Sequence, residues 1–81
     1  MATILYFSTP TCGPCKMFKP TVVEVLGSRV QYIDAQQNSE LAGKYGITSV
    51  PTMLVVEGES VVKRHTGVMS KQQLKEFAGI A

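Results

Sequence analysis

Residues 2–26 read ATILYFSTPTCGPCKMFKPTVVEVL, an apolar run followed by two closely spaced cysteines. The run from Ala2 to Phe7 is rich in Ile, Leu, Tyr and Phe and meets a Ser-Thr-Pro sequence, which predicts a buried strand that ends at a loop. After Cys15, apolar residues recur at the spacing of one helix face, at Phe18, Val22, Val25 and Leu26. We therefore predict an amphipathic helix of about 12 to 15 residues, for which Gly27 supplies the stop.

Two prolines bear on the course of this helix. Pro14 suits the first helical turn, where a backbone N–H has no partner in any case. Pro20 lies inside the helix, removes one hydrogen bond and should kink it. In the alternative interpretation, Pro20 separates two short elements.

The middle of the chain predicts a strand and a short helix. Val30 to Ile33 forms the strand, and a polar connection follows it. Asn38 or Ser39 then caps a helix that ends at Lys44, and Gly46 closes it.

The last third of the chain predicts a hairpin and a helix. The run from Met53 to Val56 pairs with Val61-Val62 across the turn at residues 57–59, which indicates an antiparallel hairpin. Ser70 and Gln73 fit a capping box, so the last helix begins at Ser70. The apolar residues that this helix buries are Leu74, Phe77 and Ala78.

The order strand, helix, strand, helix, strand, strand, helix predicts an α/β fold. We expect a four-stranded mixed sheet flanked by three helices, in which the first three strands form crossover units and the hairpin adds an antiparallel edge. The chain has 81 residues. Two hydrophobic cores could not both be built from that length, so we expect residues 1–81 to be a single domain.

The charge and hydropathy of the chain argue against two classes of binding partner, nucleic acids and membranes. There are 8 Lys and Arg against 6 Asp and Glu, a net charge of +2, and the basic residues are scattered. Without a basic stripe, a nucleic-acid partner is disfavoured. No apolar run is long enough to span a membrane, and the N-terminus lacks the basic start of a signal sequence. We therefore expect a soluble, unprocessed cytoplasmic protein with no nucleic-acid or membrane partner.

The two cysteines carry the chemistry. They are too few for the disulfide framework of a small secreted protein, so we interpret them as working groups. At a strand-to-helix junction, Cys12 faces free N–H groups and the positive end of the helix dipole, which favours its thiolate. We predict that Cys12 is the nucleophile and that Cys15, one turn inside the helix, resolves the mixed disulfide with the substrate. Gly13 allows close backbone approach, and Pro14 stiffens the turn.

Two other interpretations of the cysteine pair compete. A tetrahedral zinc site needs about two more ligands, and His65 is the one further Cys or His in the sequence. We therefore expect neither a metal nor a cofactor in a monomer. A cluster shared across a dimer stays open, because two chains supply four thiolates. Inert core thiols fit poorly with two cysteines spaced by Gly-Pro at a helix start.

The sequence resembles the thioredoxin family over nearly all of its length. The similar segments are, in order, Cys12 to Met17 with Pro20, Asn38 to Ala42, Lys44 to Ile47, Val50 to Thr52, Gly67, and Ser70 to Leu74. The resemblance implies a thioredoxin fold and a thiol-disulfide oxidoreductase that reduces protein disulfides. It also implies disulfide-containing proteins as substrates and re-reduction by a flavoprotein thioredoxin reductase or by the glutathione system. We expect the protein to be a monomer.

The resemblance further assigns a substrate-binding rim. Val50-Pro51 is similar to the family's cis-proline loop, so a cis bond there would turn the loop toward Cys12. The Val50 backbone is then expected to pair with an extended substrate segment. The other rim residues are Thr11, Gly13, Pro14, Gly67 and Val68.

Three residues depart from the family's pattern. Thr11 stands where most thioredoxins have Trp. Tyr6 aligns with a buried Asp thought to help deprotonate the resolving thiol, and Tyr32 aligns with a Lys beside it. Tyr is a poor base near neutral pH because its unperturbed pKa is about 10. We therefore hypothesise that water, or the leaving thiolate of the substrate, takes the Cys15 proton.

Two alternative functions stay open. The length and the Ser-Thr-Pro-Thr sequence before Cys12 are also similar to glutaredoxins, which makes a glutathione-using reductase one alternative. Gly-Pro between the cysteines favours the thioredoxin side. The second alternative is a non-catalytic thioredoxin-fold binding subunit whose thiols are dispensable.

Overall fold

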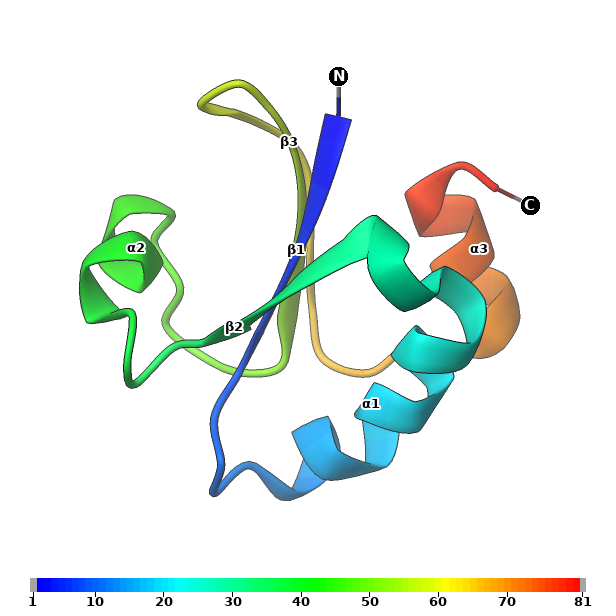
Figure 1. The fold of residues 1–81 in the computed structure, drawn as a ribbon, viewed down its shortest axis with the longest axis horizontal. Coiled ribbons are helices and arrows are strands. Elements are labelled where there is room, and N and C mark those ends of the chain that lie inside the picture. The colour runs from blue at the N-terminus through cyan, green and yellow to red at the C-terminus, as the bar shows by residue number, and fades with distance from the viewer. Residues whose placement is uncertain (1, 81) are drawn as a thin grey trace.

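The computed structural model describes residues 2–80, which form a sheet between two layers of helices (Figure 1). The elements are, in chain order, β1 (Ala2–Ser8), α1 (Gly13–Leu26), the short 3-10 helix η1 (Gly27–Arg29), β2 (Val30–Asp34), α2 (Ser39–Lys44), β3 (Thr52–Glu57), β4 (Ser60–Thr66) and α3 (Lys71–Ala78). The α/β class and the predicted order of strands and helices are confirmed, and η1 is an addition. Within residues 2–80, no helix combines the length and apolar character needed to cross a bilayer.

The sheet has the strand order β2-β1-β3-β4. β1 runs parallel to β2, whereas β3 is antiparallel to both of its neighbours. The expected crossover between the second and third strands is therefore wrong, while the crossover through α1 is present. With six residues, α2 is about 9 Å long at 1.5 Å per residue, too short to return the chain along the sheet. β3 consequently starts at the end of the sheet where β2 stops.

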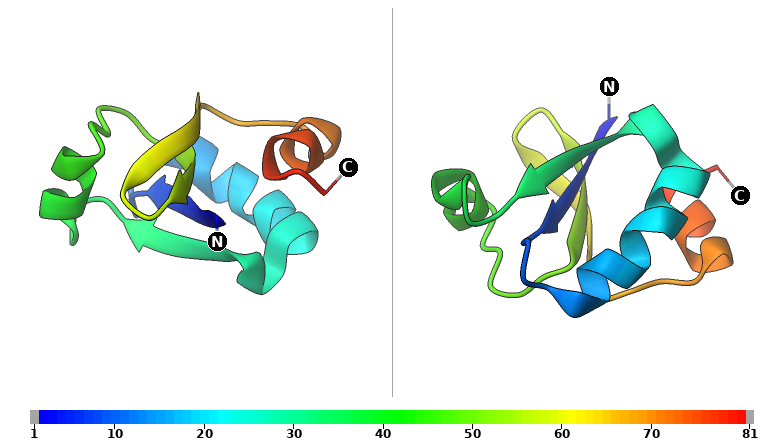
Figure 2. Two further views of the ribbon diagram at one scale, coloured as in Figure 1. Left: turned by 90° about the horizontal axis from the view of Figure 1, so that it is seen from above. Right: turned by 60° about the horizontal axis from the view of Figure 1, so that its bottom comes forward.

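Helices cover both faces of the sheet, with α1 and α3 on one side and α2 on the other (Figures 1 and 2). Successive side chains of β1 point to opposite faces, as in any strand. Tyr6 packs with Phe18 of α1 and Leu74 of α3. Phe7 packs with Ala42 of α2 on the other face. β1 therefore lies at the centre of both halves of the core.

α1 has 14 residues, which agrees with the predicted length, and Cys12 is its N-cap. Pro14 lies in the first turn, as expected. The helix continues through Pro20 to Leu26, so the alternative with two separate elements is wrong. At the C-terminal end, Gly27 adopts a φ of 53°, a left-handed conformation that few other residues adopt.

The hairpin strands are longer than the hydrophobic pattern indicated. The apolar run ends at Val62, whereas β4 continues through charged residues to Thr66. β4 is an edge strand whose side chains are nearly all exposed, so its pairing with β3 depends on backbone hydrogen bonds. An apolar pattern therefore underestimates its length.

The starts of the two short helices differ in their caps. Ser70 caps α3, and both hydrogen bonds of the predicted capping box with Gln73 are present. Leu74 is fully buried, as predicted. Asn38 occupies the N-cap position of α2, but its side chain donates to the backbone carbonyl of Asp34 at 3.1 Å instead of capping the helix. Of the two predicted cap residues, Asn38 and Ser39, Asn38 is therefore the N-cap, but its side chain makes no capping hydrogen bond.

Candidate active site

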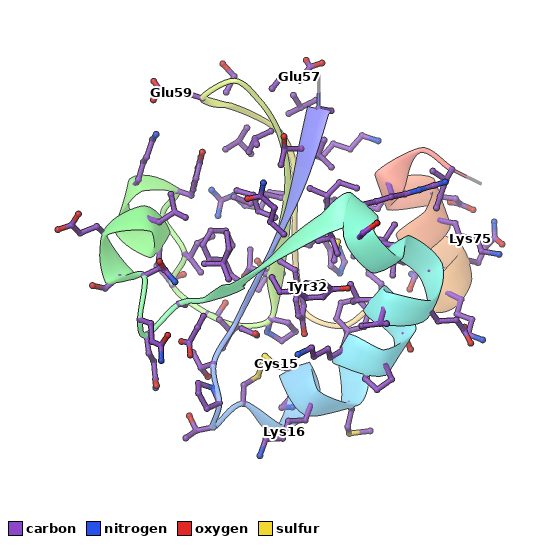
Figure 3. All side chains as sticks on the ribbon, in the orientation of Figure 1. Cys15, Lys16, Tyr32, Glu57, Glu59 and Lys75 are labelled. Carbon is purple, nitrogen blue, oxygen red and sulfur yellow. A yellow bond between two sulfur atoms is a disulfide. The ribbon has the colours of Figure 1, made fainter. Side chains whose placement is uncertain are left out.

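Cys12 and Cys15 form a disulfide at the start of α1. Their Cα atoms lie 5.2 Å apart, because one is the N-cap and the other lies in the first helical turn. Cys12 is partly exposed, whereas Cys15 is only 3% exposed. Figure 3 shows Cys15 where α1 begins, beside the end of β1. A single helical turn thus holds the two sulfur atoms at bonding distance.

The surroundings of the Cys12 sulfur are electropositive. The backbone N–H of Cys15 donates to Cys12 Sγ at 3.1 Å. No acidic residue lies in the first turn of α1, and Lys16 follows Cys15 directly. The N-terminus of a helix also carries a partial positive charge. Once the disulfide is reduced, these groups stabilise a thiolate on Cys12 relative to the thiol.

The loop before β3 faces Cys12. The peptide bond between Val50 and Pro51 is cis, as the resemblance implied. The carbonyl oxygen of Val50 lies 3.7 Å from Cys12 Sγ. The N–H of Gly67 donates to the Pro51 carbonyl at 2.8 Å, which connects the loop to the segment after β4. Three of the predicted rim residues are thus brought together beside the disulfide.

The other predicted rim residues lie around the start of α1. Pro14 and Val68 line a common cleft of about 310 Å³. Thr11 and Gly13 are exposed and adjoin the site as the chain neighbours of Cys12. Met17, which the sequence reasoning did not select, lines the same cleft and is 81% exposed. The sequence could have identified Met17, because it is an apolar residue that lies outside the buried face of α1.

Tyr6 and Tyr32 lie side by side, in register on β1 and β2. Their ring centroids are 5.9 Å apart in an edge-to-face arrangement. The Tyr6 hydroxyl donates to the backbone carbonyl of Cys15 at 3.2 Å, a contact that the sequence did not predict. Burial, and secondarily the charge of an ionised Tyr32, raises the pKa of Tyr6, and burial raises the pKa of Tyr32. Both phenols are therefore protonated at neutral pH.

His65, the candidate third metal ligand, lies on β4. Its ring packs edge-to-face against Phe77, with 6.2 Å between the ring centroids. Within residues 2–80, no three His, Cys, Asp or Glu residues are grouped so as to hold a metal ion. His65 therefore belongs to the contact between β4 and α3.

A mixed sheet with a disulfide in the first turn of α1, faced by a cis-proline loop, defines the class of the thiol-disulfide oxidoreductases. Within this class, a family model described as thioredoxin matches residues 1–79. The chain is 41% identical over 76 residues to the thioredoxin of Bacillus subtilis (strain 168), which covers 88% of this chain and 73% of that protein. It is 30% identical over 79 residues to the thioredoxin of Haemophilus influenzae, which covers 91% of this chain and 74% of that protein. The chain belongs to the thioredoxin family.

Comparison with solved structures agrees with this assignment. A mutant thioredoxin from Halobacterium salinarum NRC-1 matches with a TM-score of 0.83 at 29% identity, over 93% of this chain and 69% of that one. The predicted thioredoxin fold is thereby confirmed. As a family member with a close Cys12–Cys15 pair, the protein is a thiol-disulfide oxidoreductase that reduces protein disulfides, as the sequence predicted.

Proposed function

We propose that Cys12 is the nucleophile and Cys15 the resolving thiol of this reductase. The Cys12 thiolate attacks one sulfur of a substrate disulfide, forms a mixed disulfide and releases the first substrate thiolate. The Cys15 thiolate then attacks Cys12 Sγ, which forms the Cys12–Cys15 disulfide and releases the second substrate thiolate. Two electrons pass from the protein to the substrate, and the disulfide form is the product state.

The difference in exposure between the two sulfurs carries this assignment. Cys12 is the partly exposed cysteine and accepts a hydrogen bond from the Cys15 N–H, so it is the one that a protein substrate can reach as a thiolate. Cys15 is 3% exposed, so a protein substrate cannot reach it and it reacts only with Cys12 of the same chain. The order of attack follows from this asymmetry.

The rim around Cys12 is proposed to bind the substrate. An extended substrate segment pairs with the Val50 backbone beside Pro51, as a strand adds to a sheet edge. Val68 is 55% exposed and offers an apolar contact on the other side. Thr11, Gly13, Pro14 and Gly67 complete this rim.

A cycling dithiol also needs a reductant and a reducing compartment. Family membership supports a flavoprotein thioredoxin reductase as the electron donor, and the apolar rim suits a protein partner. The glutathione system is the alternative donor. We propose that the protein works as a cytoplasmic monomer, because a dithiol persists where thiols are kept reduced.

Trapping of mixed disulfides tests the roles of the cysteines. Cys15→Ser leaves Cys12 able to attack but removes the resolving thiol, so this variant should accumulate covalent adducts with protein substrates. Cys12→Ser should trap none. Non-reducing gel electrophoresis after alkylation measures the adducts, and the reverse pattern would refute the assignment.

Insulin-disulfide reduction tests the reductant. The assay is run with NADPH and a thioredoxin reductase, and separately with glutathione and glutathione reductase. Turnover in the first system supports the proposed donor, whereas turnover confined to the second would make the protein a glutathione-dependent reductase. Biological activity retained by a double Cys→Ser variant would favour the binding-subunit alternative.

A further inference from the structure

A cleft of about 330 Å³ lies between the start of α1 and the ends of β1 and β2. Cys15 lines this cleft together with Lys16 and Lys19 of α1 and Tyr32 and Asp34 of β2. A water molecule occupies about 30 Å³ in the liquid, so the cleft has room for several. It therefore gives the buried Cys15 a contact with solvent.

Cys15 needs such a contact, because a thiol must lose its proton before it can attack a disulfide. The two neighbouring tyrosines are unsuited to take that proton. The Tyr6 hydroxyl already donates to the Cys15 carbonyl at 3.2 Å. The pKa of Tyr6 and that of Tyr32 are raised by burial, so neither phenol is ionised at neutral pH.

Asp34 provides an acceptor that lines the same cleft as Cys15. It is the last residue of β2 and pairs in register with Ser8 at the end of β1. Its Oδ1 accepts the N–H groups of Gln36 at 2.8 Å and Gln37 at 3.3 Å, which holds the carboxylate in one orientation. Among the described residues that line the cleft, Asp34 is the one carboxylate.

We propose that Asp34 accepts the proton of Cys15 through water in this cleft. The inference rests on the proposed role of Cys15 as the resolving thiol. The S–H proton passes through water to the carboxylate while the Cys15 sulfur attacks Cys12 Sγ. The Cys12–Cys15 bond forms, and the bond between Cys12 and the substrate sulfur breaks. The substrate sulfur leaves as a thiolate that solvent protonates, and Asp34 returns its proton to solvent.

The remaining charged groups at the cleft favour this transfer. Lys16 and Lys19 both line it, and Lys19 Nζ lies 5.6 Å from the centroid of the Tyr32 ring. Positive charge stabilises the Cys15 thiolate that the transfer leaves behind. Among the described residues, the titratable groups that line the cleft beside Cys15 or hydrogen-bond to its carbonyl are thus two lysines, two protonated tyrosines and one carboxylate.

Stopped-flow reaction of the reduced protein with excess dithiodipyridine separates the two steps. Cys12 releases the first thiopyridone at a rate proportional to the reagent concentration, and Cys15 releases the second at a rate independent of it. Asp34→Asn retains an oxygen for the Gln36 and Gln37 N–H groups but takes no proton. We expect this variant to slow the second phase by about a hundredfold or more and to leave the first phase unchanged.

A pH profile distinguishes proton transfer from a structural effect. The second phase of the wild-type protein should show an inflection on the acid side, which Asp34→Asn should lack. Glu57→Gln removes the same charge at the other end of the sheet and should change neither phase (Figure 3). Far-ultraviolet circular dichroism and thermal unfolding verify the fold of both variants.

Two results would overturn the proposal. If the second phase is unchanged in a folded Asp34→Asn variant, the Cys15 proton is accepted by water or by the leaving thiolate and not by Asp34. A wild-type pH profile without the acid-side inflection would also show that Asp34 does not accept the Cys15 proton, whether or not the variant folds. Failure of Cys15→Ser to trap substrates would instead refute the cysteine roles on which the inference rests.

Discussion

The hydroxyl group of Tyr6 donates a hydrogen bond to the backbone carbonyl of Cys15 across 3.2 Å. Tyr6 is 1% exposed, and its ring packs edge-to-face on Phe18 and Tyr32. Burial raises the pKa of Tyr6, so the phenol serves as a donor and not as a base. The bond ties the centre of β1 to the first turn of α1, where the disulfide lies.

Replacing Tyr6 with Phe should therefore affect stability more than chemistry. Tyr6→Phe removes one buried hydrogen bond, and the free energy of unfolding should fall by about 1 kcal/mol. Insulin reduction should slow by less than about tenfold, whereas loss of a general base costs about a hundredfold or more. Tyr45→Phe, which removes a phenol that packs against Phe7 on the opposite face, is the control. A hundredfold loss of turnover in Tyr6→Phe alone would show that the phenol is needed.

The stability of the protein should fall at alkaline pH. The folded-state pKa of Tyr6 is raised above its unfolded value of about 10. The associated stabilisation is therefore fully present below pH 10 and is lost as the pH rises through the folded-state value. Urea unfolding at about pH 9 and about pH 11 measures the decline, and Tyr6→Phe should show a smaller one. Lysines titrate in both proteins, so equal slopes would contradict the assignment to Tyr6.

The charge of Lys16 should influence the reactivity of Cys12. Lys16→Glu places a negative charge in the first turn of α1, which disfavours the thiolate. Alkylation of the reduced protein by iodoacetamide at neutral pH should slow about threefold, and high salt should reduce the difference. Lys75→Glu makes the same charge change on α3 and should have no effect (Figure 3). Equal rates for the two variants would rule out a local electrostatic contribution from Lys16.

An acidic side chain at position 68 should weaken the binding of protein substrates. Val68 is 55% exposed and shares a cleft with Pro14 and Met17. Val68→Asp should lower kcat/KM for insulin by about tenfold, equivalent to about 1.4 kcal/mol, because the charge must be desolvated on docking. Reaction with a small aromatic disulfide should change little. Val62→Asp alters a similarly exposed valine on β4 and is the control, and a matching loss there would point to a general effect of charge.

The local elements of the fold were predictable because their signals lie within one turn or one strand. The apolar spacing in residues 18–26 predicted α1, and Ser70 with Gln73 predicted the start of α3. The direction of β3 was not predictable in this way. It depends on the end of the sheet at which the chain lies after the short helix α2, and no local sequence pattern predicts that position.

The candidate site was predictable to the same extent. The spacing of Cys12 and Cys15 and the resemblance around Pro51 identified the disulfide and the cis bond. The hydrogen bond from Tyr6 to Cys15 was not predicted. The alignment showed only that Tyr6 replaces the buried Asp of the family. A family pattern shows which residue type is absent, but not what its replacement contacts.

By itself, the sequence determined that this protein carries one dithiol at the start of a helix, since two cysteines three positions apart meet within a single turn. Only the tertiary structure decided what surrounds that dithiol. The Val50 carbonyl lies 38 positions from Cys12 along the chain, and Asp34 shares a cleft with Cys15 from another strand. The physical reason is the separation along the chain of the residues that interact. Backbone hydrogen bonding within one turn fixes the sulfur pair locally, whereas its neighbours are set by strand register and by packing across the sheet.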